Sequence, residues 1–464
     1  MGLADLFHRA GRARSFPETD GFTDAAREPE KFVMGAEDRF AVGNSGDLVV
    51  VGTVRGTVRA GDAVQVFNFG DDDAQTFSAA VDGIETGLRQ KAAAVTDGRA
   101  ALRIKSGARL PIRCGTVLCA AGTAAAEMRD AYAAALGAAL ARDAAYLLRP
   151  ASAQGLSATD CAELLRIFRR QSGAPGGAAA NGGPQTGARL EGLLREKLLA
   201  AGDVSCVFST ATDEPYLFSQ TFAKDGAYRC APPVILLITK AYRKILSPQY
   251  AQDGFEVRKI PAADGGLSDF LGAAFYLDGA QAAAVNFLQA ALPGRALAAP
   301  PDPGGVPPVE RPVMNPDLER WLLLMAQLGR PQTPDAEKIA AVYTSLMGQE
   351  LLKANLLIPM KHKGNIPAPD ASGKTVVPAG VEFSLATIKG KGDRPAVRMF
   401  TDWKRLRAAM GADWEGLIQP VGGMIEKFDC AVNLTAAGMG CYISKEVYEL
   451  FSRKDDPPAP DDPR

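Results

Sequence analysis

Short valine-rich segments separated by glycine turns, between residues 31 and 121, constrain the fold of this chain more than any other feature. The pattern is clearest from Glu37 to Val66, where a valine run is followed by Gly56 and Gly61. Glycine adopts positive φ at tight turns, and Asp62 can close such a turn with its side chain. Several short strands at this spacing are typical of a sandwich or a barrel, and closure into a barrel removes exposed strand edges. We therefore predict an all-β barrel, with strands over 39–42, 48–54, 63–67, 76–84, 100–104 and 116–120.

Length and charge bound what the whole chain can be. At about 150 residues per domain, a chain of 464 residues suggests roughly three domains. Hydrophobic residues make up 47% and charged residues 23%, as in an ordinary folded protein. The formal net charge is −1, which excludes a molecule that is cationic or acidic over its whole surface.

The cysteines and the first thirty residues point to the cytoplasm. The seven cysteines are dispersed and none forms a Cys-x-x-Cys pair, which argues against a disulfide framework and against a zinc site. Residues 1–30 contain no apolar stretch of signal-peptide length and are expected to be a mobile N-terminal segment. No window holds the roughly 18 uninterrupted apolar residues that a membrane-spanning helix needs, so we expect no membrane span.

The barrel region is similar to a known family. The motif elements are an acidic residue before Phe40, the turn at Gly46, the segment from Gly56 to Asp62, and Val81-Asp82-Gly83-Ile84-Glu85. On these residues, 31–121 resembles domain II of elongation factor Tu and its translational GTPase relatives. The resemblance implies a β-barrel, and it implies contact with RNA, although no single residue carries that contact over. The loop Asp71-Asp72-Asp73 is extra with respect to the family pattern.

No GTPase domain accompanies this barrel. A phosphate-binding loop requires Gly-x-x-x-x-Gly-Lys-Ser/Thr, so that backbone amides can cradle phosphates. In the segment ending Gly373-Lys374-Thr375, the first glycine of that motif is replaced by Ala368. We therefore expect neither nucleotide binding nor GTP hydrolysis.

The rest of the chain alternates folded and linker-like segments. We predict a helical connector over 122–172, a flexible linker over 173–188, an α+β domain over 189–293, a proline-rich linker over 294–313, a second α+β domain over 314–453, and a disordered acidic tail over 454–464. Within 189–293 we expect a strand over 270–276 and a helix over 281–288.

The last α+β domain also resembles a family. Its matching elements are Leu357-Ile358-Pro359-Met360, then Arg398-Met399-Phe400-Thr401 followed by Trp403, and Cys430-Ala431-Val432-Asn433-Leu434. These resemble the N-terminal domain of the SseB protein family. Residues 234–242 parallel 396–403, since both are a strand, a threonine and a helix with an aromatic residue in its first turn. Such junctions are common, so whether 189–293 is a diverged second copy stays open at this point.

Basic residues near the C-terminal end form the best candidate partner surface. The candidate residues are Lys389, Lys391, Arg394, Arg398, Trp403 and Lys404, which could grip phosphate or an acidic partner. The competing interpretation is a solvated hairpin tip followed by an exposed helix face carrying Arg405 and Arg407.

No catalytic constellation is evident. The two histidines, His8 and His362, are far apart in the sequence, and the carboxylates Asp213, Glu214 and Asp302 lie in turns where charged residues are solvated. We expect no cofactor and no metal.

The predicted function is a non-enzymatic, SseB-like binding or scaffold protein of the bacterial cytoplasm with protein partners. One alternative is a translation-associated factor that docks its barrel on ribosomal or transfer RNA without GTPase activity. It would use a basic face made of Arg55, Arg59, Arg99, Arg103, Lys105, Arg109 and Arg113. The other alternative is an enzyme of unrecognised type centred on Cys430 or Cys441.

Overall fold

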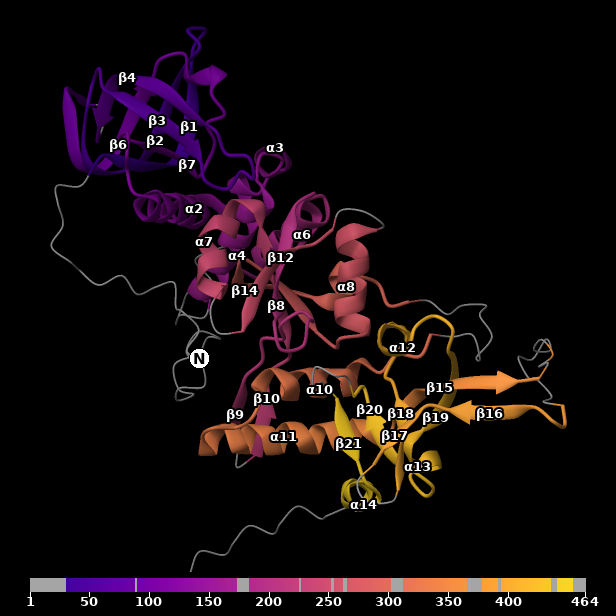
Figure 1. The fold of residues 1–464 in the computed structure, drawn as a ribbon. Helices are drawn as coiled ribbons and strands as arrows, with labels where there is room; N and C mark the ends of the chain where they lie inside the picture. The colour runs from indigo at the N-terminus through magenta and orange to yellow at the C-terminus, as the bar shows by residue number, and fades with distance from the viewer. Residues whose placement is uncertain are drawn as a thin grey trace, which may run out of the picture.

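The computed structural model describes residues 31–87, 90–172, 183–224, 227–251, 254–261, 265–301, 312–364, 367, 378–390, 394–434 and 440–453. It shows a β-barrel, a first α+β unit (158–297) and a second α+β unit (316–452), following one another through the molecule (Figure 1). Of the helices in these ranges, none combines the length and the apolar character that a membrane crossing needs. The predicted segments 1–30 and 454–464 lie outside the described residues.

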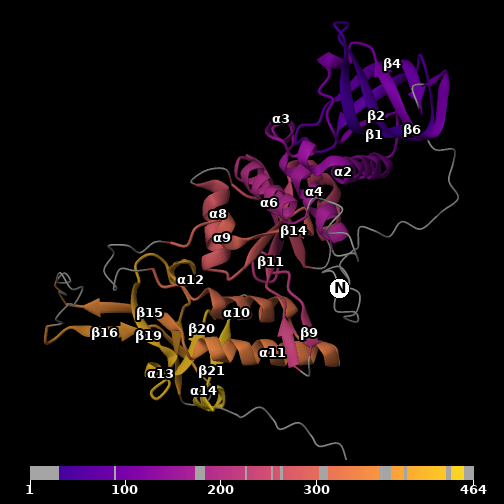
Figure 2. The ribbon, with the colours of Figure 1, turned by 180° about the vertical axis from the view of Figure 1, so that it is seen from behind.

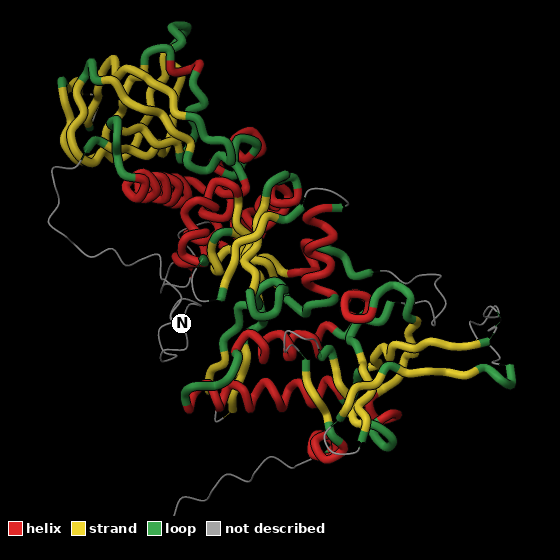
Figure 3. The backbone as a smooth tube through the Cα atoms, viewed as in Figure 1, coloured by secondary structure: helices red, strands yellow, loops and turns green. Residues whose placement is uncertain are grey.

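The barrel is closed and antiparallel, as the sequence predicts (Figure 3). Within the described residues its ring runs β3-β7-β1-β2-β6-β4 and back to β3, and β5 pairs on the outside with β4. Gly56 has the expected positive φ, 71°, but it lies at a bulge inside β2, where the register shifts against β6, and not at a turn. The predicted turn at Gly61 and Asp62 is confirmed, since Gly61 has φ 97° and Asp62 accepts the N–H of Arg59 at 2.8 Å. The strands are β1 (Val33–Val42), β2 (Asp47–Arg59), β3 (Ala63–Asn68), β4 (Thr76–Thr86), β5 (Gln90–Ala92), β6 (Ala94–Ile104) and β7 (Thr116–Cys119), with a short 3-10 helix η1 (Gly107–Arg109).

An alanine-rich helix joins the barrel to the first unit. Helix α2 (Ala125–Leu147) lies against β1, and a short helix α3 (Pro150–Ala153) follows it. A Cβ at Gly35 of β1 would lie 2.1 Å from the carbonyl oxygen of Ala131. The small residues on both elements therefore permit the close approach that seats the barrel on this helix.

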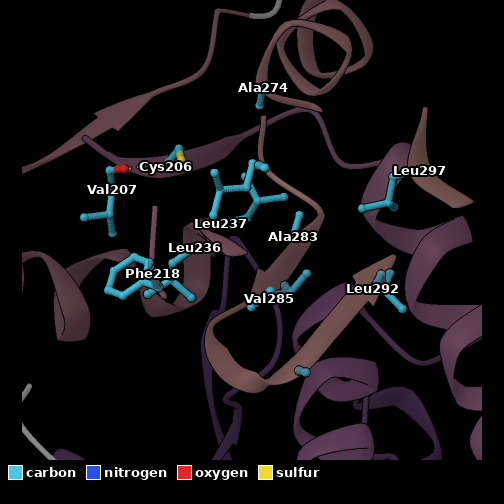
Figure 4. Packing of buried hydrophobic residues seen from close by; sticks show 14 of the residues in the cluster. Cys206, Val207, Phe218, Leu236, Leu237, Ala274, Ala283, Val285, Leu292 and Leu297 are labelled. Atoms are coloured by element: carbon cyan, nitrogen blue, oxygen red, sulfur yellow. Dashed lines mark hydrogen bonds between the residues drawn. The ribbon is translucent and has the colours of Figure 1, made fainter. Parts of the chain in front are cut away.

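The first unit is a mixed sheet in the order β12-β8-β11-β13-β14, flanked by helices (Figures 1 and 2). Strands β11 and β13 are parallel, and their side chains form the apolar centre drawn in Figure 4. Its elements are α4 (Ala158–Ser172), α6 (Gly183–Leu199), β8 (Val204–Ser209), β9 (Thr221–Lys224), β10 (Ala227–Cys230), β11 (Val234–Thr239), α7 (Lys240–Tyr250), β12 (Phe255–Lys259), α8 (Gly266–Tyr276), β13 (Ala282–Val285), β14 (Phe287–Pro293) and α9 (Gly294–Leu297).

Two element predictions in this unit are wrong. The expected strand over 270–276 is part of α8, where Leu271, Ala274 and Phe275 recur at helical spacing and are buried together. The expected helix over 281–288 is the strand pair β13 and β14, because pairing with β11 overrides the helical preference of the alanines. In addition, α4 of the expected connector packs on α6 and β14, and α6 begins inside the expected linker.

The second unit repeats this topology. Its sheets β16-β15-β19 and β17-β18-β20-β21 are linked by a bridge between Leu357 and Phe400, which gives a central order β19-β15-β18-β20-β21 with β18 and β20 parallel. The elements are α10 (Pro316–Leu328), α11 (Pro334–Leu351), β15 (Asn355–Lys363), β16 (Glu382–Leu385), β17 (Thr387–Lys389), β18 (Pro395–Met399), α12 (Trp403–Met410), β19 (Glu415–Pro420), α13 (Val421–Met424), β20 (Asp429–Val432), β21 (Cys441–Ile443) and α14 (Lys445–Ser452).

The correspondence between the units extends to single hydrogen bonds. Tyr216 donates its N–H to the carbonyl of Val207 in the first unit, and Ala386 donates to Pro359 at the same place in the second. The units differ in which hairpin is long. The first extends β9–β10, which lies along α11 in both views, whereas the second extends β15–β16 away from the body (Figures 1 and 2).

Candidate functional site

A polar junction sits where the two parallel strands of each unit end. In the first unit, Thr239 donates its N–H to Asn286 Oδ1 at 2.9 Å, and Asn286 Nδ2 donates to Thr239 Oγ1 at 3.1 Å. Thr401 and Asn433 make the same two bonds in the second unit, at 3.1 and 2.8 Å. Both asparagines have positive φ. This repeated junction is the strongest sign in the described residues that the two units are copies of one design.

The third member of the junction differs between the copies. In the first unit it is Thr159 of α4, whose hydroxyl lies 2.8 Å from that of Thr239. In the second unit it is Glu319 of α10, which accepts hydrogen bonds from Thr401 at 3.1 Å and from Asn433 at 2.5 Å. A neutral hydroxyl in one copy is thus a buried carboxyl group in the other.

This carboxyl group belongs to a buried charge cluster between the units, here named the Arg405 cluster. The guanidinium of Arg405 lies 2.6 Å from Asp402, 2.7 Å from Asp278, 2.9 Å from Glu319 and 3.3 Å from Glu214. Lys404 lies 2.7 Å from Glu214 and 3.6 Å from Asp278. Glu214 and Asp278 belong to the first unit and the other four residues to the second, so the cluster spans the boundary.

Local structure explains why these groups meet. Asp402 caps α12 by accepting the N–H of Arg405 at 2.9 Å, which places Arg405 in the first turn. Glu214 ends the tight turn after β8, Asp278 follows α8, and Glu319 lies in the first turn of α10. The side chains of Arg405 and Glu319 are 5% and 0% exposed, so the contacts operate in a medium of low polarity.

The cluster holds more carboxyl groups than cations. Burial raises the pKa of Glu319 to about 7, and the nearby Asp402 and Asp278 contribute to the rise against the lowering effect of Arg405. Burial also raises the pKa of Glu214, with Asp278 adding to it. Burial alone would lower the pKa of Arg405, but the surrounding carboxylates outweigh it and hold that pKa well above its usual range.

The predicted partner-surface residues have separate environments. Lys389 is exposed on β17, and Lys391 lies outside the described residues. The guanidinium of Arg394 lies 3.2 Å from Asp429 and donates to the carbonyl of Ile425 at 2.6 Å. Arg398 donates to the carbonyl of Leu434 at 3.2 Å.

The remaining predicted residues lie near the cluster. Trp403 packs so closely on β19 that a Cβ at Gly416 would lie 2.5 Å from its ring, and Lys404 belongs to the Arg405 cluster. Two expectations are corrected here. Arg405 does not lie on an exposed helix face, and Glu214 is not a solvated turn residue, because both are enclosed by the facing unit.

A second polar contact joins the barrel to the first unit. Arg113 of the barrel lies 2.6 Å from Asp71 and 2.9 Å from the buried Asp160 of α4. Asp72 accepts the N–H of Ala241 at the start of α7, and Asp73 pairs with Lys240. The loop Asp71-Asp72-Asp73 therefore contacts the next part of the chain.

The remaining candidate residues have surroundings that are ordinary for a folded protein. Burial raises the pKa values of Cys430 and Cys441 to about 12, which leaves little thiolate near neutral pH. His362 contacts Glu415 at 3.0 Å, while His8 and Asp302 lie outside the described residues. An open pocket of about 340 Å³ beside Val204 and the start of α8 has no titratable side chain in its lining. In the described part of the chain, no group of His, Cys, Asp and Glu is arranged to hold a metal ion.

Comparison with known proteins finds similarity to solved structures. No family model matches the chain, and no curated protein matches it. Among solved structures, the chain is similar to translation elongation factor SelB from Methanococcus maripaludis in its apo form, with 23% sequence identity and a TM-score of 0.17. The match covers 20% of this chain and 20% of that chain.

Proposed function

We propose that the protein is a non-enzymatic binding scaffold of the bacterial cytoplasm, built from a translation-factor-like barrel and two SseB-like α+β units. The observation that carries this proposal is the Arg405 cluster, which fixes one unit on the other with six charged groups, all of them buried or half-buried except Lys404. One apolar core also runs from Val33 of the barrel through the first unit to Ile443.

Buried ion pairs of this kind specify an arrangement more than they add stability. Removing charges from water costs several kcal/mol per ion, roughly as much as the pairing returns. Arg405 can satisfy its contacts only if Glu214 and Asp278 of the facing unit are in place. Such a device suits a protein whose role depends on holding binding surfaces at fixed positions.

The partner surface is proposed around Lys389, which is exposed on β17 of the second unit, the unit that also carries Arg405. Tagged full-length protein is expected to retain a specific protein partner from native bacterial extract, and Lys389→Glu is expected to weaken this retention at least about tenfold because reversing a contact charge adds repulsion. The matched control is Lys244→Glu, the same reversal at an exposed position on α7, which leaves retention unchanged. Equal effects of the two variants, or no partner at low salt, contradict the proposal.

Fewer observations support the RNA-docking alternative, because several residues of the predicted basic face form ion pairs within the protein. Arg99 and Arg103 of the predicted basic face pair with Glu37 and Asp47 of the barrel at 3.0 and 2.6 Å, and Arg113 is engaged as described above. Arg59, Lys105 and Arg109 are exposed. RNA binding that falls steeply with salt, and that Arg59→Glu weakens while Lys389→Glu does not, would favour this alternative over the scaffold.

A further inference from the structure

We propose that the Arg405 cluster is a proton-dependent latch between the two α+β units, tight while Glu319 carries a proton and loosened once that proton is lost. The proposal rests on the count and the position of the charges. It goes beyond the scaffold function, since it concerns how firmly the units are held.

The helix that carries Glu319 is the element seated against the first unit. A Cβ at Gly279 would lie 2.1 Å from the carbonyl oxygen of Pro316, and Arg320 donates to the carbonyl of Gly279 at 2.8 Å. Further along α10, Gln327 accepts the N–H of Leu217 and donates to the carbonyl of Pro215, both at 3.2 Å. Glu319 therefore lies where α10 contacts the first unit, one helical turn after Pro316, the residue that approaches Gly279 most closely.

Among the described residues, the charged and titratable groups that face Glu319 come from both units. Arg405 and Asp402 come from the start of α12, and Asp278 comes from the first unit. Glu214 contacts Arg405 and Lys404 rather than Glu319 itself. The thiol of Cys441 on β21 also interacts with Glu319. With Glu319 protonated, three carboxylates face the two cations. With Glu319 ionised, a fourth carboxylate is added with no cation to match it.

The direction of the pH effect follows from linkage. In the closed latch the pKa of Glu319 is raised from 4.5 to about 7, whereas on separation the carboxyl group meets water and returns toward its ordinary value. The closed state then binds more protons between these two values, so it loses stability as pH rises from 4.5 to about 7 and changes little above that.

The first copy provides an internal contrast. At the corresponding junction Thr159 stands in place of Glu319, and a hydroxyl does not titrate in this range. The junction of the first unit is therefore expected to lack this pH response.

The experiment is hydrogen exchange of the full-length protein across this pH window, corrected for the intrinsic rate. Protection of α10 and of the start of α12 is expected to fall by at least about tenfold between about pH 5 and about pH 7, then level off, whereas protection of β2 in the barrel does not follow this course. Glu319→Gln keeps the shape of the side chain and removes its titration, so the fall is expected to shrink to the smaller part that Glu214 contributes. The matched control Glu163→Gln changes a buried carboxylate of α4 outside the cluster, and it keeps the wild-type profile.

A second variant keeps the proposal testable if Glu319→Gln does not fold. Asp278→Asn removes a negative neighbour that raises the pKa of Glu319, so the levelling-off moves to lower pH. Identical pH profiles for wild type, Glu319→Gln and Asp278→Asn overturn the proposal. So does a profile that Glu163→Gln flattens as much as Glu319→Gln. None of these readouts depends on a partner, so they are independent of the scaffold test.

Discussion

Arg405 shows how much can depend on one side chain. Among the described contacts, it is the one cation that lies within 3.3 Å of all four carboxyl groups of the cluster, Glu214, Asp278, Glu319 and Asp402. Two residues before and two residues after it in the sequence, Trp403 is a half-buried aromatic residue and Arg407 is an exposed cation. The distinction between Arg405 and Arg407 is therefore made by the facing unit.

Truncating Arg405 is expected to be severe. Arg405→Ala leaves the surrounding carboxylates without their shared cation, which lowers the free energy of unfolding by about 4 kcal/mol. Urea unfolding followed by circular dichroism measures this loss. Arg407→Ala on the same helix serves as the control and costs less than about 1 kcal/mol. Similar losses for the two variants would show that the cluster does not contribute as described.

Asn286 both adopts a left-handed backbone conformation and makes buried side-chain hydrogen bonds. It has φ 60°, and its amide makes buried hydrogen bonds with Thr239. Asn286→Ala loses these bonds and strains the backbone, with an expected cost of about 3 kcal/mol. Asn286→Gly loses the same bonds without the strain, so it is expected to be more stable than the alanine variant by about 1 kcal/mol. Thermal unfolding compares the two, and the reverse order would be inconsistent with the left-handed backbone.

At the scale of single elements, α7 illustrates a helix completed by a distant loop. Thr239 precedes the helix but does not cap it, since its hydroxyl is engaged with Thr159 and Asn286. The carboxylate of Asp72 on the barrel accepts the N–H of Ala241 instead. The cap of this helix therefore comes from a loop 169 residues earlier in the chain.

Removing this cap is expected to weaken the seat of the barrel. Asp72→Ala leaves a first-turn N–H of α7 without its acceptor and costs about 1 kcal/mol. Asp73→Ala removes only an exposed ion pair with Lys240, so its effect is expected to be smaller. Hydrogen exchange at the start of α7 in the full-length protein distinguishes them, with faster exchange for Asp72→Ala alone. Equal protection in both variants would contradict the capping role.

The elements that sequence patterns predict well are those set by local chemistry. The barrel strands follow from valine runs and glycine turns, and the capped start of α11 follows from Thr333, which accepts the N–H of Ala336 at 3.2 Å. The segment 281–288 could not be assigned in this way. Its alanines suit a helix, and only the partner strand β11 makes it extended.

At the scale of the whole molecule, most buried apolar residues form two clusters, a large core of the two α+β units and a smaller core inside the barrel. The inner barrel residues, such as Met34, Val50 and Leu102, form their own cluster. The two α+β units share a continuous core with α2 and the outer face of the barrel. The units are thus expected to behave as one cooperative body, with the barrel as a separable one.

Calorimetry of the full-length protein tests this division. Two unfolding transitions are expected, one for the barrel and one for both α+β units together. Met34→Ala, in the barrel core, lowers the midpoint of the first by about 5 °C or more, and Leu237→Ala lowers that of the second. A separate third transition, or a shift of both transitions by either variant, would show that the cores are divided differently.

The sequence by itself determined the closed barrel, its turn at Gly61 and Asp62, and the α+β character of the C-terminal half, because strand period, turn residues and caps act over a few residues. The tertiary structure decided that Glu214 and Arg405 are buried partners, that Asp72 caps α7, and that the two units share the same junction hydrogen bonds. These features depend on groups brought together from distant positions. A carboxylate in a turn has the same local pattern whether water or an arginine of another unit faces it, so only the packed structure could distinguish them.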